Sequence, residues 1–183
     1  MEKLILSNEQ ISDEEKDILY KLANNYIRNV FNFISKLKDK IVVFDFDGTL
    51  TQFQYAENRI LPCDEEDLYE YSKNNNIYDN VKIIETMQYV MSKLDPKDMY
   101  IITNSVGTIK EKKQKTIDEN CKYILKENVL HTKSKEDKLE KMKEIHYKTG
   151  KKIIFVEDMA TNIQLMEENT DFIQGFHISS LLS

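Results

Sequence analysis

The sequence contains few cysteines, few arginines and no long apolar run. Cys63 and Cys121 are the two cysteines among 183 residues, too few for a disulfide framework and without the spacing of a metal site. The apolar runs are only a few residues long, and charged residues follow Met1, so neither a signal peptide nor a membrane span is expected. We therefore expect a soluble, cytoplasmic protein with reduced thiols.

Positive charge is also limited, because the formal net charge is -6 and the only two arginines are Arg28 and Arg59. Nucleic-acid binding usually requires a positive surface and bidentate arginine contacts, so no nucleic-acid partner is expected. No membrane partner is expected either. Lysine-rich stretches such as KEKKQK at 110–115 alternate with acids at helical spacing, which predicts solvated helix faces.

The spacing of apolar residues predicts alternating helices and strands in one domain. Ser12 and Glu15 form a capping-box signature, and the helical period that follows predicts a helix to about Lys38. Strands are predicted from residues 41, 99 and 152, with a weaker one at 129–131. Helices are predicted at 83–94 and 106–121, in a segment ending near Gly150, and around 163–166. This alternation indicates an α/β fold with a mainly parallel sheet.

Two carboxylates follow the most apolar strand, within IVVFDFDGTLT at 41–51. Because side chains alternate along a strand, Asp45 and Asp47 are expected to point to the same side and Phe46 to the other. Ligands of parallel α/β sheets bind at the carboxyl ends of the strands. The other carboxyl ends carry polar residues as well, namely Thr103, Asn104, Ser105, Glu157 and Asp158.

These side chains should meet in one crevice. Carboxylates packed closely repel one another unless a cation lies among them, and an all-oxygen environment suits Mg²⁺. The sequence therefore predicts a magnesium site at the carboxyl edge of the sheet.

Four segments resemble, in order, the motifs of the haloacid dehalogenase superfamily. They are DFDGTL at 45–50, the strand-end Thr103, a lysine at the start of a later helix, and FVEDMATN at 155–162. The resemblance extends from about residue 41 to the C-terminus. It implies a Rossmann-like three-layer sandwich with a mainly parallel sheet and phosphoryl-transfer chemistry with Mg²⁺.

The resemblance also implies roles for individual residues. Asp45 would be the nucleophile that forms an aspartyl-phosphate, and Asp47 the general acid and base. Dehalogenases of the family lack an acid at the second position, so Asp47 favours phosphoryl transfer. Thr103 would bind a phosphoryl oxygen. The metal would be held by Asp45, the Asp47 backbone carbonyl and Asp158, with Glu157 either beside the metal or orienting the lysine.

Three lysines are candidates for the catalytic position: Lys133, Lys135 and Lys138. In the family this lysine commonly precedes the first core-facing apolar residue of its helix by four positions. Counting back from Leu139 selects Lys135, with Lys133 as the next choice.

The substrate is expected to contact residues after the first motif and around the second strand end. Gly48 allows a sharp turn and Thr49 supports the site. The candidate substrate-binding residues are Gly48, Thr49, Asn104, Ser105, Phe53, Tyr55 and Arg59. Residues 51–80 are predicted to form a small cap or flap on a core domain at 41–183, with 1–40 as an N-terminal helical extension.

The predicted function is that of a Mg²⁺-dependent phosphatase of small phosphorylated metabolites such as nucleotides or sugar phosphates. Two alternatives share the same residue types. A receiver-like phosphoacceptor domain also uses clustered acids, a hydroxyl and a lysine, but it carries its acceptor aspartate after the third strand. A catalytically silent binding module would have the same fold, yet none of the expected chemical groups is missing here.

Overall fold

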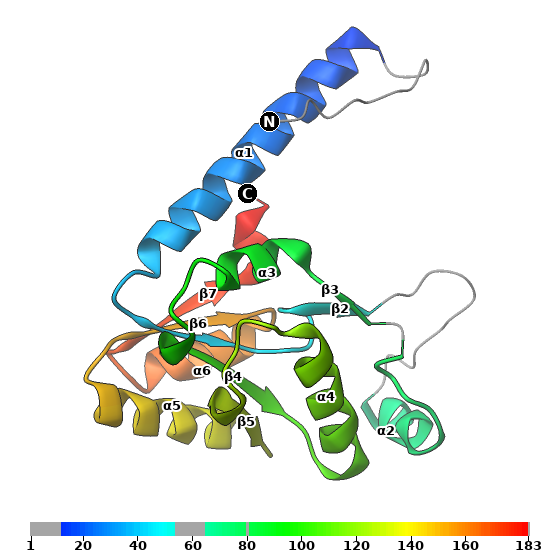
Figure 1. Ribbon diagram of the computed structural model, residues 1–183, viewed down its shortest axis with the longest axis vertical. Helices are drawn as coiled ribbons and strands as arrows, with labels where there is room; N and C mark the ends of the chain where they lie inside the picture. The colour runs from blue at the N-terminus through cyan, green and yellow to red at the C-terminus, as the bar shows by residue number, and fades with distance from the viewer. Residues whose placement is uncertain (1–11, 54–64, 80, 183) are drawn as a thin grey trace.

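A five-stranded parallel sheet, ordered β5-β4-β1-β6-β7, forms the centre of the protein (Figure 1). The computed structural model describes residues 12–53, 65–79 and 81–182. The strands are β1 Ile41–Phe44, β4 Met99–Asn104, β5 Val129–Thr132, β6 Ile153–Glu157 and β7 Ile173–His177. The helices are α1 Asp13–Lys36, α2 Glu65–Asn74, α3 Glu85–Met91, α4 Gly107–Asn120, α5 Lys135–Thr149 and α6 Ala160–Glu168. The predicted α/β class with a parallel sheet is confirmed.

Helices pack on both faces of the sheet because successive strand residues point to opposite sides. Val42 and Phe44 of β1 belong to a buried cluster that includes residues of α1, α3 and α4. Ile41 and Val43 belong to a second cluster, which includes residues of α5 and α6. Both faces of β1 are thus apolar, as is usual for a central strand of a parallel sheet.

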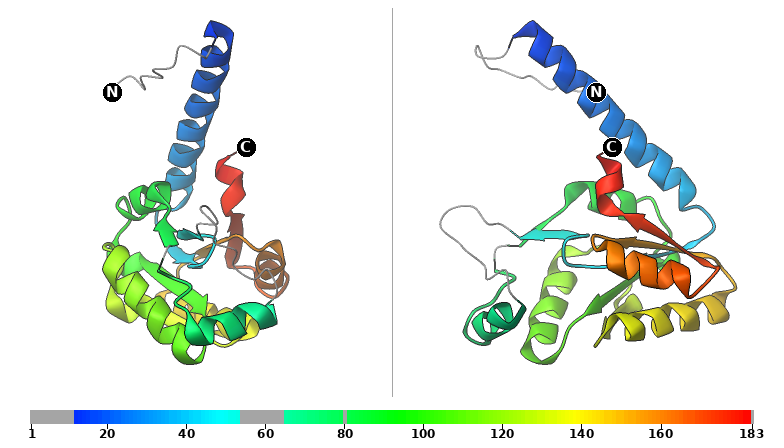
Figure 2. Two further views of the ribbon diagram at one scale, coloured as in Figure 1. Left: turned by 90° about the vertical axis from the view of Figure 1, so that its right-hand side faces the viewer. Right: turned by 180° about the vertical axis from the view of Figure 1, so that it is seen from behind.

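Helix α1 begins with the predicted capping box. The Ser12 amide donates to Glu15 Oε2 at 2.8 Å, and the Glu15 amide donates to Ser12 Oγ at 3.2 Å. Its second half packs on the sheet through Val30 and Phe33, whereas its first half extends beyond the body of the protein (Figure 2). Leu22 is accordingly 60% exposed. Within the described ranges, no helix has the length and apolar character that crossing a membrane requires.

The segment between β1 and β4 contains a small antiparallel pair, β2 Thr51–Phe53 and β3 Val81–Ile83. The prediction that a helix begins at residue 83 is wrong, because Ile83 pairs with Thr51 and α3 starts two residues later. Lys112 of α4 binds the C-terminal end of helix α2. The Lys112 ammonium donates to the carbonyls of Ser72 and Asn75, at 3.0 and 2.8 Å.

Candidate active site

The candidate site lies where the strand order of the sheet reverses. Numbered along the chain, the five strands of the main sheet have the order 3-2-1-4-5, so the reversal falls between β1 and β6. Ligands of such sheets bind outside the carboxyl ends of the strands at this point. Asp45 directly follows β1 and Glu157 ends β6. A cavity of about 780 Å³ opens here, a size that suits small-molecule ligands.

Three carboxylates form the acidic end of this cavity. Asp45, Glu157 and Asp158 each offer an oxygen atom, and these atoms lie within 4.8 Å of one another. Hard divalent cations prefer such all-oxygen environments. With the three carboxylates and the neighbouring Lys138 all ionised, two negative charges remain, which one divalent cation would balance. The cluster could therefore hold a metal ion.

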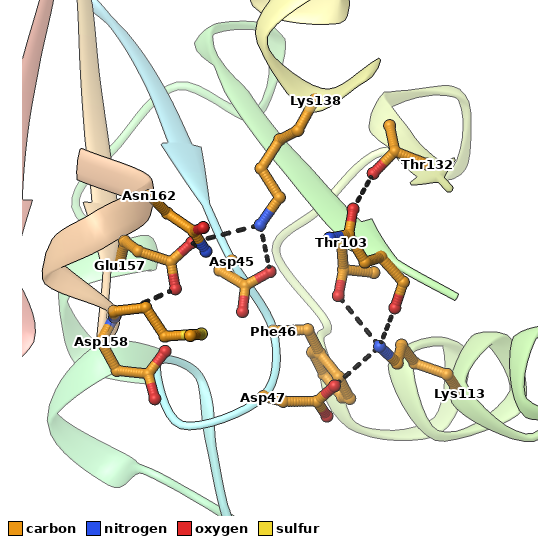
Figure 3. Close-up of polar contacts among 12 residues, drawn as sticks. Asp45, Phe46, Asp47, Thr103, Lys113, Thr132, Lys138, Glu157, Asp158 and Asn162 are labelled. Carbon is orange, nitrogen blue, oxygen red and sulfur yellow. Dashed lines mark hydrogen bonds and ion pairs between the residues drawn. The ribbon is translucent and has the colours of Figure 1, made fainter. Parts of the chain in front are cut away.

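Lys138 of α5 lies between two of these acids (Figure 3). Its Nζ atom is 2.8 Å from Asp45 Oδ1 and 3.2 Å from Glu157 Oε2, and its side chain is only 2% exposed. Burial acts to lower the pKa of Lys138, but the Asp45 and Glu157 carboxylates outweigh it and raise this pKa overall. Lys138 therefore remains protonated beside Asp45.

The prediction that Lys135 contacts Asp45 is wrong, because Lys138 makes this contact. Lys135 is the first residue of α5 and is exposed, whereas Lys138 lies one turn further on. Lys138 precedes the buried Met142 by four residues, so the two share one face of the helix. The rule of four residues before the first core-facing apolar residue therefore fails here, because Leu139 is that residue and Lys138 directly precedes it.

Glu157 is engaged by several donors at once. Its Oε2 atom accepts from Lys138 and from Asn162 Nδ2 at 3.0 Å, and its Oε1 atom accepts from the amides of Asp158 and Met159. Glu157 thus contacts the lysine, in line with the alternative role considered from the sequence. Burial raises the pKa of Glu157, and likewise that of Asp45, while the Lys138 charge opposes both shifts.

Asp47 faces a second lysine, Lys113 of α4 (Figure 3). Lys113 Nζ lies 2.7 Å from Asp47 Oδ2 and donates to Thr103 Oγ1 at 3.1 Å and to the Asn104 carbonyl at 2.6 Å. Burial raises the pKa of Asp47, and the Lys113 charge opposes this shift. Lys113 therefore connects the aspartate after β1 with the end of β4.

Lys113 was not among the predicted site residues, and the prediction of a solvated face at 110–115 is wrong at this residue. The Lys113 side chain is 2% exposed. It lies four residues from Ile109 and four from Ile117, both of which pack in the core. A lysine in the middle of an apolar helical stripe was the available signal.

Asp45 and Asp47 both line the cavity, but their carboxylates contact different lysines. Strand alternation predicted that both side chains point to the same place. They share the cavity, but they do not share a partner. Strand β1 already ends at Phe44, and the chain turns immediately afterwards, with Phe46 buried in the core. The side chain of Asp47 is also outside the group of three carboxylates that could hold a metal.

Gly48 is required by the close approach of Asp158. Its φ is +72°, and a Cβ atom at this position would lie 2.1 Å from Asp158 Oδ2. The next residue, Thr49, is fully buried, and its hydroxyl has no hydrogen-bond partner within the described part of the chain. Gly48 lines the cavity and Thr49 is not among its lining residues.

We expect Gly48→Ala to weaken metal binding as well as stability. Gly150 provides a matched control, since its φ is +68° and no atom lies within 4 Å of its added Cβ. In both alanine variants the free energy of unfolding should fall by roughly 1–2 kcal/mol, because alanine is strained at a positive φ. Only Gly48→Ala should also displace Asp158 and weaken the binding of a divalent cation in a calorimetric titration. Equal cation binding by the two variants would contradict this role of Gly48.

The other predicted site residues divide into three groups. Thr103 and Asn104 line the cavity. Ser105 Oγ instead contacts His131 Nδ1 at 2.5 Å, and His131 Nε2 contacts Gln114 Oε1 at 2.7 Å. The predictions for Tyr55 and Arg59 lie outside the described residues, and Phe53 is placed only as part of β2.

His131 should make the protein less stable in mild acid. Burial, together with the charges of Lys110 and Lys113, lowers the pKa of His131 to about 4. An unfolded histidine has a pKa of about 6.5, so between this pH and about 4 the unfolded chain binds one proton more than the folded chain. The His131 contribution should be complete above about pH 6.5 and should decline as the pH falls toward 4. Urea unfolding of wild type and His131→Gln should show a smaller loss in the variant; parallel losses would contradict this.

The N-terminal helix and the C-terminal segment also reach the cavity. Tyr26 of α1 lines it, as do the neighbours Ile178 and Leu181 in the C-terminal 3-10 helix η3, Ile178–Leu181. Asn29 Nδ2 donates to the Leu181 carbonyl at 3.3 Å and so holds α1 against η3. The N-terminal helix is therefore part of the cavity wall.

No model of a known protein family matches this sequence, and no curated protein matches it either. The fold and the side chains of the cavity therefore carry the functional assignment. They show a parallel α/β sheet with a carboxylate cluster that could hold a metal ion at its carboxyl edge. Such a cluster in a cavity suggests catalysis.

Proposed function

We propose that this protein is a Mg²⁺-dependent phosphomonoester hydrolase of the haloacid dehalogenase type that acts on a small phosphorylated metabolite. The observation that carries the proposal is the meeting of Asp45, Asp158 and Lys138 at the point of strand reversal. A nucleophilic carboxylate, a possible metal site and a buried cation are the groups that phosphoryl transfer needs. Residues 51–80 would act as a small cap and residues 1–40 as a helical extension.

In the first step, an Asp45 oxygen attacks phosphorus and the bond between phosphorus and the ester oxygen breaks. The electron pair of that bond passes to the leaving oxygen, which receives a proton from Asp47 and departs as the alcohol. The burial that raises the pKa of Asp47 favours the protonated form needed here. Lys138 stabilises the charge that gathers between Asp45 and the phosphoryl group.

In the second step, water attacks the aspartyl-phosphate. Asp47, now a carboxylate, removes a proton from the water, and the bond between phosphorus and Asp45 breaks. Inorganic phosphate leaves and the Asp45 carboxylate is restored. The Lys113 ammonium, 2.7 Å from Asp47, favours the carboxylate form that this step requires. Thr103 would donate its hydroxyl hydrogen to a phosphoryl oxygen.

Mg²⁺ fits the donor set of the cluster. Asp45, Asp158 and the Asp47 carbonyl would hold the ion, while Glu157 orients Lys138. When bound, the ion neutralises negative charge on the phosphoryl oxygens and on the cluster.

The strand order supports a hydrolase of this type over a receiver-like phosphoacceptor. Receiver domains have the order 2-1-3-4-5, whereas the order here is 3-2-1-4-5. The acceptor aspartate of a receiver follows the third strand, but the third strand of this sheet, β5, ends at Thr132. A silent binding module is disfavoured because the nucleophile, the acid and the lysine are all present in the cavity.

Phosphate release from a panel of phosphomonoesters, with Mg²⁺ and with the metal chelated, tests the proposal. We expect Mg²⁺-dependent release from small monoesters and poor activity on a phosphorylated oligonucleotide, because such a ligand needs a positive surface and the net charge of -6 disfavours one. Absence of release from every substrate, or release unaffected by chelation, would refute the proposed reaction. Preference for the oligonucleotide, lost at high salt, would refute the expected substrate size.

A further inference from the structure

Besides its charged residues, the cavity has an apolar lining, which we call the wall. Six apolar or aromatic residues line it: Tyr26, Ile84, Met159, Ile178, Leu181 and Leu182. They come from α1, from the residues just before α3 and α6, and from the C-terminal segment. Met159 and Leu182 are 53% and 78% exposed, so their apolar surface is available to a ligand.

Polar groups on this wall are mostly satisfied by the protein itself. The Tyr26 hydroxyl contacts Thr86 Oγ1 at 2.6 Å, and the Ser179 hydroxyl contacts His177 Nδ1 at 2.7 Å. Thr51 Oγ1 donates to the Phe46 carbonyl at 3.0 Å. Gln52, Asn104 and Ser179 are the exposed polar residues among the described lining.

All charged residues among the described lining belong to the acidic end. They are Asp45, Asp47, Lys138, Glu157 and Asp158. The wall therefore offers a ligand mainly apolar and aromatic surface with a few uncharged polar groups, and its described residues include no charged partner for a second anionic group.

From this division of the cavity we infer that the substrate is the phosphomonoester of an apolar alcohol. The inference rests on the proposed function, and it narrows the small metabolites considered above. The acidic end takes the phosphoryl group, and the wall of Tyr26, Met159, Leu181 and Leu182 takes the carbon chain. Hydrolysis converts the ester and water into the free alcohol and inorganic phosphate.

Burial of each additional methylene group should tighten binding about fourfold. A sugar chain of the same length would bring hydroxyl groups against side chains that cannot satisfy them, which costs binding energy. Sugar phosphates should accordingly be poor substrates of this cavity.

The sharpest comparison is between n-hexyl phosphate and sorbitol 6-phosphate, which have the same number of carbons and both release a primary alcohol. With Mg²⁺ present, we expect kcat/KM for hexyl phosphate to be at least about tenfold higher, mainly through KM. Methyl, butyl and octyl phosphate extend the series, and 2-phenylethyl phosphate tests an aromatic chain. A KM that falls with the length of the alkyl chain, or a low KM for 2-phenylethyl phosphate, supports the inference.

Two wall variants and one control locate the effect. Leu182→Ser and Met159→Ser change exposed wall residues and should each reduce the preference for hexyl over sorbitol phosphate severalfold. Leu22→Ser changes an exposed leucine of α1 that is not among the cavity-lining residues and should retain the wild-type preference. Equal loss of the preference in the control would contradict the role of the wall.

The outcomes separate this inference from the proposed function. Hydrolysis of both six-carbon esters with equal kcat/KM would overturn the apolar substrate class and leave the hydrolase standing. Absence of hydrolysis of every ester would overturn the hydrolase. In that case, the affinities of hexylphosphonate and methylphosphonate, measured by calorimetry, still test whether the wall binds an apolar chain. Tighter binding of hexylphosphonate would support this role of the wall, and equal binding would refute it.

Discussion

Asp45→Asn is expected to abolish phosphate release while leaving the fold intact. An amide oxygen is a poor nucleophile toward phosphorus, so the aspartyl-phosphate cannot form, and the loss in kcat should be about 10⁴-fold or more. The substitution keeps the shape of the side chain, and Lys138 retains Glu157 as an ionic partner at 3.2 Å. Steady-state kinetics with Mg²⁺, together with circular dichroism, provide the measurement.

Asp171→Asn is the matched control, because Asp171 is exposed and is not among the cavity-lining residues. It should have wild-type kinetics. Near-normal turnover by Asp45→Asn would show that another group is the nucleophile. An unfolded Asp45→Asn protein would show instead that the aspartate is needed for stability, contrary to the account given for Lys138 and Glu157.

Lys138→Met should have the largest effect on stability. Methionine keeps much of the buried stem but removes the charge that faces Asp45 and Glu157, leaving both carboxylates without their cation. Removal of one partner from a buried ionic group typically costs roughly 3–5 kcal/mol. Turnover should also be lost, because nothing would then offset the charge between Asp45 and the phosphoryl group. Urea unfolding and steady-state kinetics measure the two effects.

Lys135→Met serves as the control from the same helix. Lys135 is exposed, so its loss should change stability by no more than about 0.5 kcal/mol and leave turnover unchanged. A second check is the double variant Lys138→Met with Asp45→Asn, in which the destabilisation should be smaller because one of the two buried charges is gone. If Lys135→Met were the more damaging single variant, the assignment of Lys138 would be wrong.

The backbone of the site could be predicted because it follows from strand patterns. Apolar runs that end in acids identified β1 and β6, and the carboxyl ends of parallel strands meet at one edge of the sheet. That reasoning correctly brings Asp45, Glu157 and Asp158 together. The capping box at Ser12 and the left-handed Gly150 at the end of α5 were equally local signals.

The two buried lysines of the site were harder to predict than its acids, because the placement of a lysine side chain depends on tertiary packing. A long side chain can extend into the protein or into solvent from the same helix, and interleaved charges usually indicate solvent. Lys113 and Lys138 both lie within charged stretches, yet each is buried where an acid of the site needs a cation. Strand β3 was missed for a related reason, since its three residues pair with β2 across a long segment.

The most direct test of the central claim is to trap the covalent intermediate. Wild-type protein mixed with Mg²⁺ and a hydrolysed monoester would be quenched rapidly in acid and reduced with borohydride, which converts an aspartyl-phosphate into homoserine. Peptide mass spectrometry then locates the modified residue. Homoserine at position 45, absent when the metal is chelated, is the predicted result. Homoserine elsewhere, or unmodified Asp45 in protein that is turning over substrate, would contradict the account.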